Sequence, residues 1–347
     1  MKILVTGAAG FIGQSIMAFF SKSQIDAIGI DILSVGGNPG DTNLRFLQVD
    51  ILNRRALEEN FKSFKPEVVV HLASKLGHHG TSMEYIWENN LHGTMNVAEL
   101  SEIYKVRQLI FLSTNSIWCE NNLEIVDEAH PPSFVEPYGA SKYACEEFLL
   151  NRDSSLKITI LRAPIIMGGN RVGLFGHYFI FVKENRRLYV VGSGKNIVQI
   201  IAIEDLIAAI SLSIDKEVTG VFNLGTSFNY SILQFTQELI RHAQSRSRLI
   251  RLPARVMIPI LKILHKAGLS PLGPFQYSTL VNSFRMNSYE FNRQTGWRAQ
   301  VDPINALVNS YDTWLITDSS NENQVNVKSP NTAMPKSFFY QVIRKLS

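Results

Sequence analysis

A tyrosine and a lysine four residues apart, Tyr138 and Lys142, are the side chains in this sequence best suited to proton transfer. On a helix, that spacing puts both side chains on one face. A tyrosine with the usual pKa of about 10 is a poor base at neutral pH, but a neighbouring ammonium favours the phenolate and lowers its pKa. The run Ser113-Thr114-Asn115-Ser116 adds hydroxyls that could share a substrate proton, although such residues are also ordinary caps at a strand end. These residues predict an acid/base site that acts on a substrate oxygen.

A glycine-rich loop near the N-terminus indicates the kind of cofactor. Gly7, Gly10 and Gly13 follow a β-rich run (KILVT) and open an apolar helical segment. In that context the first glycine permits a tight turn, the second lets the backbone approach a pyrophosphate, and the third lets the helix pack close to the sheet. The phosphates would meet the free N–H groups at the helix N-terminus. The sequence therefore predicts a dinucleotide site, and a positively charged nicotinamide would lower the pKa of Tyr138 further.

The residue at the end of the second β-rich run favours NAD over NADP. The carboxylate of Asp31 can accept hydrogen bonds from both hydroxyls of the adenosine ribose and would repel a 2′-phosphate. Ile32 and Leu33 follow, so no arginine stands ready for that phosphate. Asp50 and Ile51 follow the third run, where the adenine should lie, although an aspartate there is often only a cap.

The elements that must position these residues alternate regularly between strand and helix. That order predicts an α/β fold, with a Rossmann-type, doubly wound parallel sheet in residues 1–167. The expected strands are 2–6, 27–31, 44–49, 67–73, 108–113 and 157–161, and the expected helices are 11–20, 54–64, 85–104 and 138–151.

After residue 168 the pattern loosens. We expect residues 168–316 to form a smaller, interleaved C-terminal substrate-binding region, with segments that return to the Rossmann domain. Residues 317–347 have the composition of a polar linker and an amphipathic tail, which should dock on the body rather than pair with a partner or touch a membrane. The apolar helix expected at 256–269 should belong to the core of the substrate-binding region rather than anchor the chain in a membrane. Further expected elements are strands near 188–191 and 221–224 and helices near 204–214 and 231–243.

Composition excludes several classes of function. The 347 residues are 45% hydrophobic and carry a formal charge of +4, without a dense Lys/Arg block, so we expect no nucleic-acid partner. No apolar run is long enough to span a membrane, and no signal peptide is evident. Cys119 and Cys145 lack metal-ligand spacing, and we expect reduced thiols in a cytoplasmic protein without a metal site. The adjacent His78 and His79 would point to different sides, which suits substrate contact better than metal binding.

The order and spacing of these motifs resemble the extended short-chain dehydrogenase/reductase family. Within it, the chain is most similar to the NAD-dependent nucleotide-sugar epimerase/dehydratase branch, which includes the UDP-galactose 4-epimerases. The resemblance covers about residues 1–315. It rests on the glycine loop, Asp31, His71-Leu72-Ala73, Asn90 with Gly93-Thr94, Ser113-Thr114, Tyr138 to Lys142, Asn223-Leu224-Gly225 and Thr295-Gly296-Trp297.

The resemblance implies a role for each matching position. Thr114 would be the catalytic hydroxyl, Tyr138 the acid/base and Lys142 the lysine that holds the nicotinamide ribose. Family members often form homodimers through the helices that here span 85–104 and 138–151. The implied NAD contacts are Gly7, Gly10, Phe11, Ile12 and Gly13 at the pyrophosphate, Asp31 at the ribose, Asp50 and Ile51 at the adenine, Leu72, Ala73, Ser74, Asn90 and Ser113 along the cofactor, and Pro164 beside the nicotinamide.

The chain departs from the branch in three places, one of which is the run Ala163-Pro164-Ile165-Ile166, where the usual asparagine after the Leu-Arg strand is replaced. Dehydratases of this branch carry an acidic pair after the catalytic threonine, where this chain has Asn115 and Ser116. An arginine that contacts the nucleotide diphosphate is missing from the stretch 197–202, and Arg171, Lys195 or Arg251 could serve instead.

We therefore expect an NAD-dependent epimerase that acts on a sugar nucleotide through a transient keto intermediate. Two alternatives remain: a dehydrogenase or reductase of a sugar or another alcohol, and a non-catalytic dinucleotide sensor or scaffold.

Overall fold

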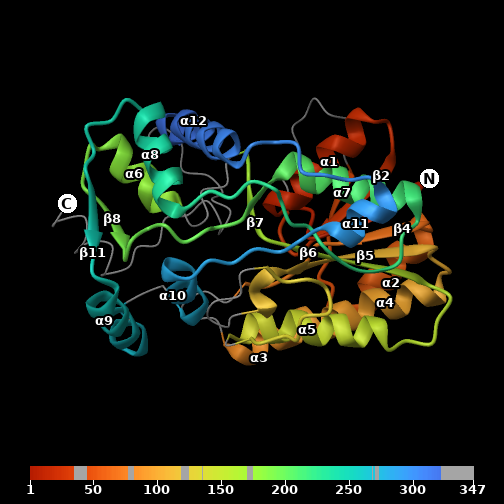
Figure 1. Cartoon of the computed structure of the whole chain (residues 1–347). Coiled ribbons are helices and arrows are strands. Elements are labelled where there is room, and N and C mark those ends of the chain that lie inside the picture. The colour runs from red at the N-terminus through yellow and green to blue at the C-terminus, as the bar shows by residue number, and fades with distance from the viewer. Residues whose placement is uncertain are drawn as a thin grey trace.

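A parallel sheet of seven strands forms the centre of the molecule, in the order β10-β6-β5-β4-β1-β2-β3 (Figure 1). The computed structural model describes residues 1–34, 45–76, 82–118, 125–134, 136–169, 175–267, 269 and 273–321. Every pairing within this sheet is parallel, so the predicted α/β, doubly wound fold is confirmed. The strands are β1 (Lys2–Thr6), β2 (Asp26–Asp31), β3 (Arg45–Gln48), β4 (Val68–His71), β5 (Gln108–Thr114), β6 (Lys157–Ala163) and β10 (Gly220–Asn223).

Helices cover both faces of this sheet, as Figure 1 shows. Side chains alternate along a strand, so Ile3 and Val5 of β1 enter one core and Leu4 enters the other. This double burial explains why the strands are apolar on both faces. One core packs α1 (Phe11–Lys22), α7 (Ile203–Lys216) and α11 (Tyr289–Thr295), and the other packs α2 (Arg54–Phe64), α4 (Gly93–Ile103) and α5 (Pro137–Leu150).

The long helix expected at 85–104 is present in three consecutive parts. It starts as α3 (Met83–Trp87), where the Ser82 hydroxyl caps the N–H of Tyr85 at 3.1 Å. It passes through a π-helical turn, η1 (Glu88–His92), and continues as α4. Such wide turns often occur at functional sites, and this one carries Asn90.

A second region forms beside the sheet from residues after 164. Two small parallel pairs, β7 (Ile165–Met167) with β9 (Ile200–Ala202) and β8 (Leu188–Val191) with β11 (Leu249–Leu252), carry helices around an aromatic core that includes Phe179, Phe235 and Tyr311. Meanwhile β10, α7 and α11 return to the main sheet. The remaining elements are η2 (Asn115–Ile117), α6 (Gly176–Lys183), α8 (Ile232–His242), α9 (Ala254–Lys266), α10 (Pro274–Val281) and α12 (Pro303–Asn321).

The helix α12 continues to Asn321, into the segment expected to be a linker. The tail beyond residue 321 lies outside the described residues, as do Cys119, His78, His79 and Arg171. Cys145 is a free, buried thiol.

The helix α9 differs from the core helix that its apolar sequence predicted. Leu261 is its one buried residue, whereas Val256, Ile260 and Ile263 are 55%, 41% and 66% exposed. It lies at the lower left of Figure 1, and α10, which contacts it, lies further in. In the described part of the chain, no helix is long and apolar enough to cross a membrane.

Candidate active site

The predicted site residues converge at one edge of the sheet. Because all seven strands are parallel, their carboxyl ends lie at the same edge, where ligands bind in folds of this class. The glycine loop follows β1, Asp31 ends β2, Thr114 ends β5 and Pro164 follows β6.

The glycine loop could not form with larger residues at two of its positions. Gly7 has φ +70°, and a Cβ there would lie 2.6 Å from the backbone nitrogen of Ala73. A Cβ on Gly13 would lie 2.3 Å from the carbonyl oxygen of Gly7. Gly10 is less constrained, at 3.2 Å from the same oxygen. The first and third glycines therefore bring the loop against the end of β4 and α1 against the loop.

The carboxylate of Asp31 joins the glycine loop to the end of β2. One oxygen accepts the N–H of Ala9 and the other accepts the N–H of Leu33, both at 2.9 Å. Asp31 is half-buried, and each carboxylate oxygen retains a lone pair. Its expected place at the end of β2 is thus observed, while its contact with a ribose stays a prediction.

A directional hydrogen-bond chain runs behind the loop through buried His71. Thr94 Oγ1 donates to the carbonyl of Asn90 at 2.6 Å, so we assign it as the acceptor of His71 Nε2–H at 2.9 Å. His71 Nδ1 then accepts from Thr6 Oγ1 at 2.6 Å, and Thr6 Oγ1 accepts the N–H of Ala73 at 3.1 Å. Burial, followed by the charge of Lys142, lowers the pKa of His71 to about 3. This series of hydrogen bonds therefore requires His71 to be neutral.

The side chain of Asn90 connects the loop after β4 to α5. Its oxygen accepts the N–H of Lys75 at 2.6 Å and the Ser74 hydroxyl at 3.2 Å. Its nitrogen donates to the carbonyl of Lys75 at 3.1 Å and to Ser141 Oγ at 2.9 Å. The Ser141 hydroxyl in turn donates to the carbonyl of Tyr138 at 2.8 Å. The Asn90 side chain therefore holds the loop after β4 against α5, and its direct contact with a cofactor stays a prediction.

The first turn of α5 presses against the turn that follows β5. Pro137 starts the helix, where its missing N–H has no consequence. A Cβ on Gly139 would lie 2.2 Å from the carbonyl oxygen of Ser116, so glycine permits this close approach. In the facing turn, Thr114 Oγ1 accepts the N–H of Ser116 at 3.1 Å. These contacts bring Tyr138 and Thr114 to the same corner of the sheet edge.

Lys142 lies one helical turn after Tyr138 and is 2% exposed. Its ammonium sits 3.8 Å from the centroid of the Phe111 ring on β5, a cation–π contact. Burial lowers the pKa of Lys142 to about 8, although Cys145 and Glu146 nearby raise it. Among the described residues, no carboxylate forms a salt bridge with this ammonium.

A buried ion pair holds α5 against β6. Arg162 and Glu146 form a salt bridge at 2.6 Å, with side chains 6% and 1% exposed. The Ser113 hydroxyl also donates to Glu146, so this predicted cofactor residue faces the helix α5. Arg162 also donates a hydrogen bond to the carbonyl of Glu128 at 3.1 Å. Its Cζ lies over the Trp118 ring, 4.9 Å from the ring centroid.

The remaining predicted residues occupy the expected loops. Ile51 is buried against Gly93, where a Cβ would lie 2.4 Å from its Cδ1, so only its backbone is available to an adenine. Asp50 caps the N–H of Leu52 at 2.9 Å. Pro164 is buried between β6 and β7. Phe11 and Ile12 begin α1, and Leu72, Ala73 and Ser74 follow β4.

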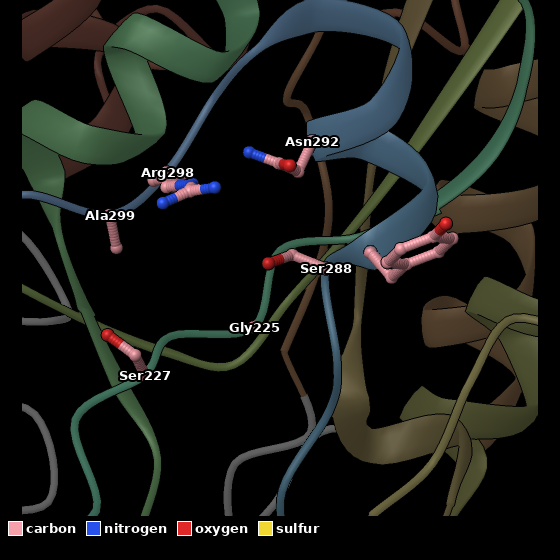
Figure 2. Close-up of a pocket in the computed structure, with 7 residues that line it drawn as sticks. Gly225, Ser227, Ser288, Asn292, Arg298 and Ala299 are labelled. Atoms are coloured by element: carbon pink, nitrogen blue, oxygen red, sulfur yellow. The ribbon is translucent and has the colours of Figure 1, made fainter.

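The structure also reveals residues that the sequence did not predict. A pocket of about 310 Å³ lies beyond the carboxyl end of β10, and the Arg298 guanidinium faces it (Figure 2). None of the predicted catalytic residues lines this pocket. Its lining consists of Gly225, Ser227, Ser288, Tyr289, Asn292, Arg298 and Ala299. Two of the residues that the sequence did not predict could have been found from their neighbours in the chain. Gly139 directly follows Tyr138, and Arg298 directly follows the pair Gly296-Trp297.

The stretch that lacks the expected arginine is tied together by a glutamine. The Gln199 nitrogen donates to the carbonyls of Thr226 and Met286 at 3.0 and 3.1 Å, and its oxygen accepts the N–H of Met286 at 3.0 Å. Lys195 and Arg251 are exposed. No cluster of three metal-ligating side chains occurs among the residues with a described position.

Comparisons with known proteins agree with this architecture. Residues 3–225 match the sequence model of the NAD dependent epimerase/dehydratase family. The chain is 28% identical over 282 residues to the UDP-glucose 4-epimerase of Bos taurus, covering 69% of this chain and 81% of that protein. It is also 28% identical over 266 residues to the dTDP-D-glucose 4,6-dehydratase of Dictyostelium discoideum, and that match spans 69% of this chain and 61% of the relative.

Solved structures show the same fold. The crystal structure of UDP-glucose 4-epimerase with UDP-glucose from Thermotoga maritima aligns with a TM-score of 0.76 and 23% identity, covering 91% of this chain and 99% of that chain. UDP-glucuronic acid 4-epimerase from Bacillus cereus, in complex with NAD, aligns with a TM-score of 0.72 and 22% identity, and the alignment covers 91% of this chain and 99% of that chain.

Proposed function

Because the chain belongs to the NAD-dependent epimerase/dehydratase family, we propose that it is an epimerase that acts on a sugar nucleotide, with Tyr138 as the acid/base. The observation that carries this proposal is the close approach of α5 to the turn after β5. It packs the first turn of α5, which carries Tyr138, against the turn that begins at Thr114, and Lys142 is buried one helical turn further along α5.

Each of these residues has a distinct task in the proposed reaction. Tyr138 takes the proton from a substrate hydroxyl and later returns a proton to the carbonyl oxygen. Thr114 donates a hydrogen bond to that same oxygen. The Lys142 ammonium, poorly solvated because it is buried, favours the phenolate form of Tyr138 and binds the nicotinamide ribose. NAD supplies the reversible acceptance of a hydride from the carbon that bears the hydroxyl.

Several residues fit the cofactor. The glycine loop leads into the N-terminus of α1, where backbone N–H groups would bind a pyrophosphate, and the Asp31 carboxylate at the end of β2 would accept the ribose hydroxyls. Epimerisation requires the keto intermediate to turn over and take the hydride back on its other face. The cofactor is then regenerated and should remain bound.

Epimerisation is favoured over dehydration by the residues after Thr114. Expulsion of water needs a proton donor beside the leaving hydroxyl, and Asn115 and Ser116 cannot serve as that acid. The second candidate, a dehydrogenase or reductase with an exchanging cofactor, uses the same three catalytic residues and differs in whether NADH accumulates.

The bound nucleotide distinguishes these two candidates. The protein is purified without added cofactor and denatured, and any released nucleotide is identified. Near-stoichiometric NAD supports the retained-cofactor cycle, and an empty protein contradicts it. A Tyr138→Phe variant should keep NAD but lose nearly all turnover, whereas a non-catalytic sensor would keep its function.

We further propose a homodimer in the cytoplasm, formed through the helices α3 to α5. Light scattering tests the dimer: an Ile103→Asp variant should dissociate it if α4 forms the interface, since Ile103 is 57% exposed in the single chain. A wild-type mass that equals one chain contradicts it.

A further inference from the structure

The outward face of α9 is an apolar stripe. Val256, Ile260 and Ile263 are spaced by four and three residues, so they lie on one side of the helix. They are 55%, 41% and 66% exposed. Single exposed apolar residues are normal, but a continuous row on one helix indicates a binding surface.

The inward face of α9 holds the helix in this orientation. Leu261 is buried, and its carbonyl accepts the hydroxyl of Tyr277 from α10 at 3.3 Å. The rings of His265 and Tyr277 meet edge to face at 6.0 Å. Rotation of the helix to bury the apolar stripe would break these contacts, so the stripe stays outside.

The sequence segment that carries the stripe is basic. The sequence from 239 to 289 contains eight Lys or Arg residues and no Asp or Glu. Arg255, Lys262 and Lys266 lie along one border of the stripe at helical spacing, and all three are exposed. None of the three forms an ion pair with another described residue, in contrast to Arg293, which pairs with Glu290. Their charge is therefore available to a partner.

From this arrangement we propose that α9 docks on the surface of a bilayer containing anionic phospholipids. Basic amphipathic helices lie in the plane of such a surface, with the apolar side at the acyl boundary and the cations among the headgroups. At 13 residues, α9 is too short to span a bilayer. A second copy of the same face is disfavoured, because two basic surfaces repel each other.

Sedimentation of the full-length protein with vesicles tests this proposal. The vesicles contain phosphatidylcholine alone or phosphatidylcholine with phosphatidylglycerol. The protein should bind only the anionic vesicles, and high salt should weaken the binding because it screens the attraction. Ile263→Asp and, separately, Lys262→Glu should each weaken the binding about tenfold or more. The matched control is Ile316→Asp on α12, where Ile316 is 73% exposed, and it should bind like the wild type.

Three outcomes would overturn the proposal. The wild type does not sediment with anionic vesicles, or Ile263→Asp binds them as well as the wild type does. In the third, Ile263→Asp lowers the melting temperature markedly or changes the oligomeric mass, which would mean that this face is covered by the chain itself or by a second copy. Vesicle binding is measured without substrate, so it is independent of the proposed enzymatic activity.

Discussion

Acid should weaken this fold through His71 more than through an ordinary histidine. The pKa of His71 falls from 6.5 to about 3 in the folded protein because the ring is buried. Because the folded protein binds the proton on His71 more weakly than the unfolded chain does, the neutral ring contributes fully to stability above pH 6.5. This contribution is lost as the pH falls from 6.5 toward 3. At pH 5 the protein is 1.5 pH units below the unfolded value, which corresponds to about 2 kcal/mol at 1.36 kcal/mol per unit.

The measurement compares urea unfolding at pH 7.5 and pH 5 for the wild type and His71→Asn. The variant removes this titration, so the wild type should lose about 2 kcal/mol more than the variant between the two pH values. Comparing the two proteins cancels the other titrating groups. Parallel losses would refute the argument, because they would mean that protonated His71 is tolerated and that the Thr6–His71–Thr94 chain does not need the neutral ring.

Three further predictions concern α5. Glu146→Gln should lower the free energy of unfolding by about 3–5 kcal/mol, because it leaves Arg162 charged and unpaired. Adding Arg162→Met should recover most of that loss. Equal losses in the single and the double variant, measured by urea unfolding, would contradict the importance of this ion pair. Lys142→Met should abolish turnover yet stabilise the cofactor-free protein by about 1–3 kcal/mol below pH 8, because it removes a buried ammonium. This gain should shrink as the pH rises toward 10.5, where the lysine loses its charge in the unfolded chain as well. A variant that thermal melts show to be destabilised would contradict the cost of burying the ammonium. Gly139→Ala should lower kcat at least about tenfold, because its Cβ would collide with the carbonyl of Ser116; unchanged kinetics would show that this close approach does not position Tyr138.

Local patterns predicted most of the fold. The run KILVT and the glycines after it specify a strand, a turn and a helix within a few residues, and the structure confirms all three. The apolar strands likewise required cover on both faces, which the helices provide. These features depend on residues close in the sequence.

The partners of the polar side chains could not be predicted in the same way. Ser113 was assigned to the cofactor, but its hydroxyl bonds to Glu146, 33 residues away. The amide of Asn90 reaches Ser141, 51 residues away. The apolar sequence of α9 looks the same whether the helix faces a core or solvent, so only the three-dimensional packing revealed its exposed stripe.

The most direct test of the proposed function follows a deuterium label through turnover. A panel of UDP-, GDP- and dTDP-sugars, labelled at the carbon to be inverted, is incubated with the wild type and with Tyr138→Phe. The wild type should yield an epimer that keeps its deuterium, without net formation of reduced cofactor, whereas Tyr138→Phe should hold NAD and yield no epimer. A Tyr138→Phe protein that turns over like the wild type, or a wild type that accumulates reduced cofactor and a keto product, would contradict the proposed function.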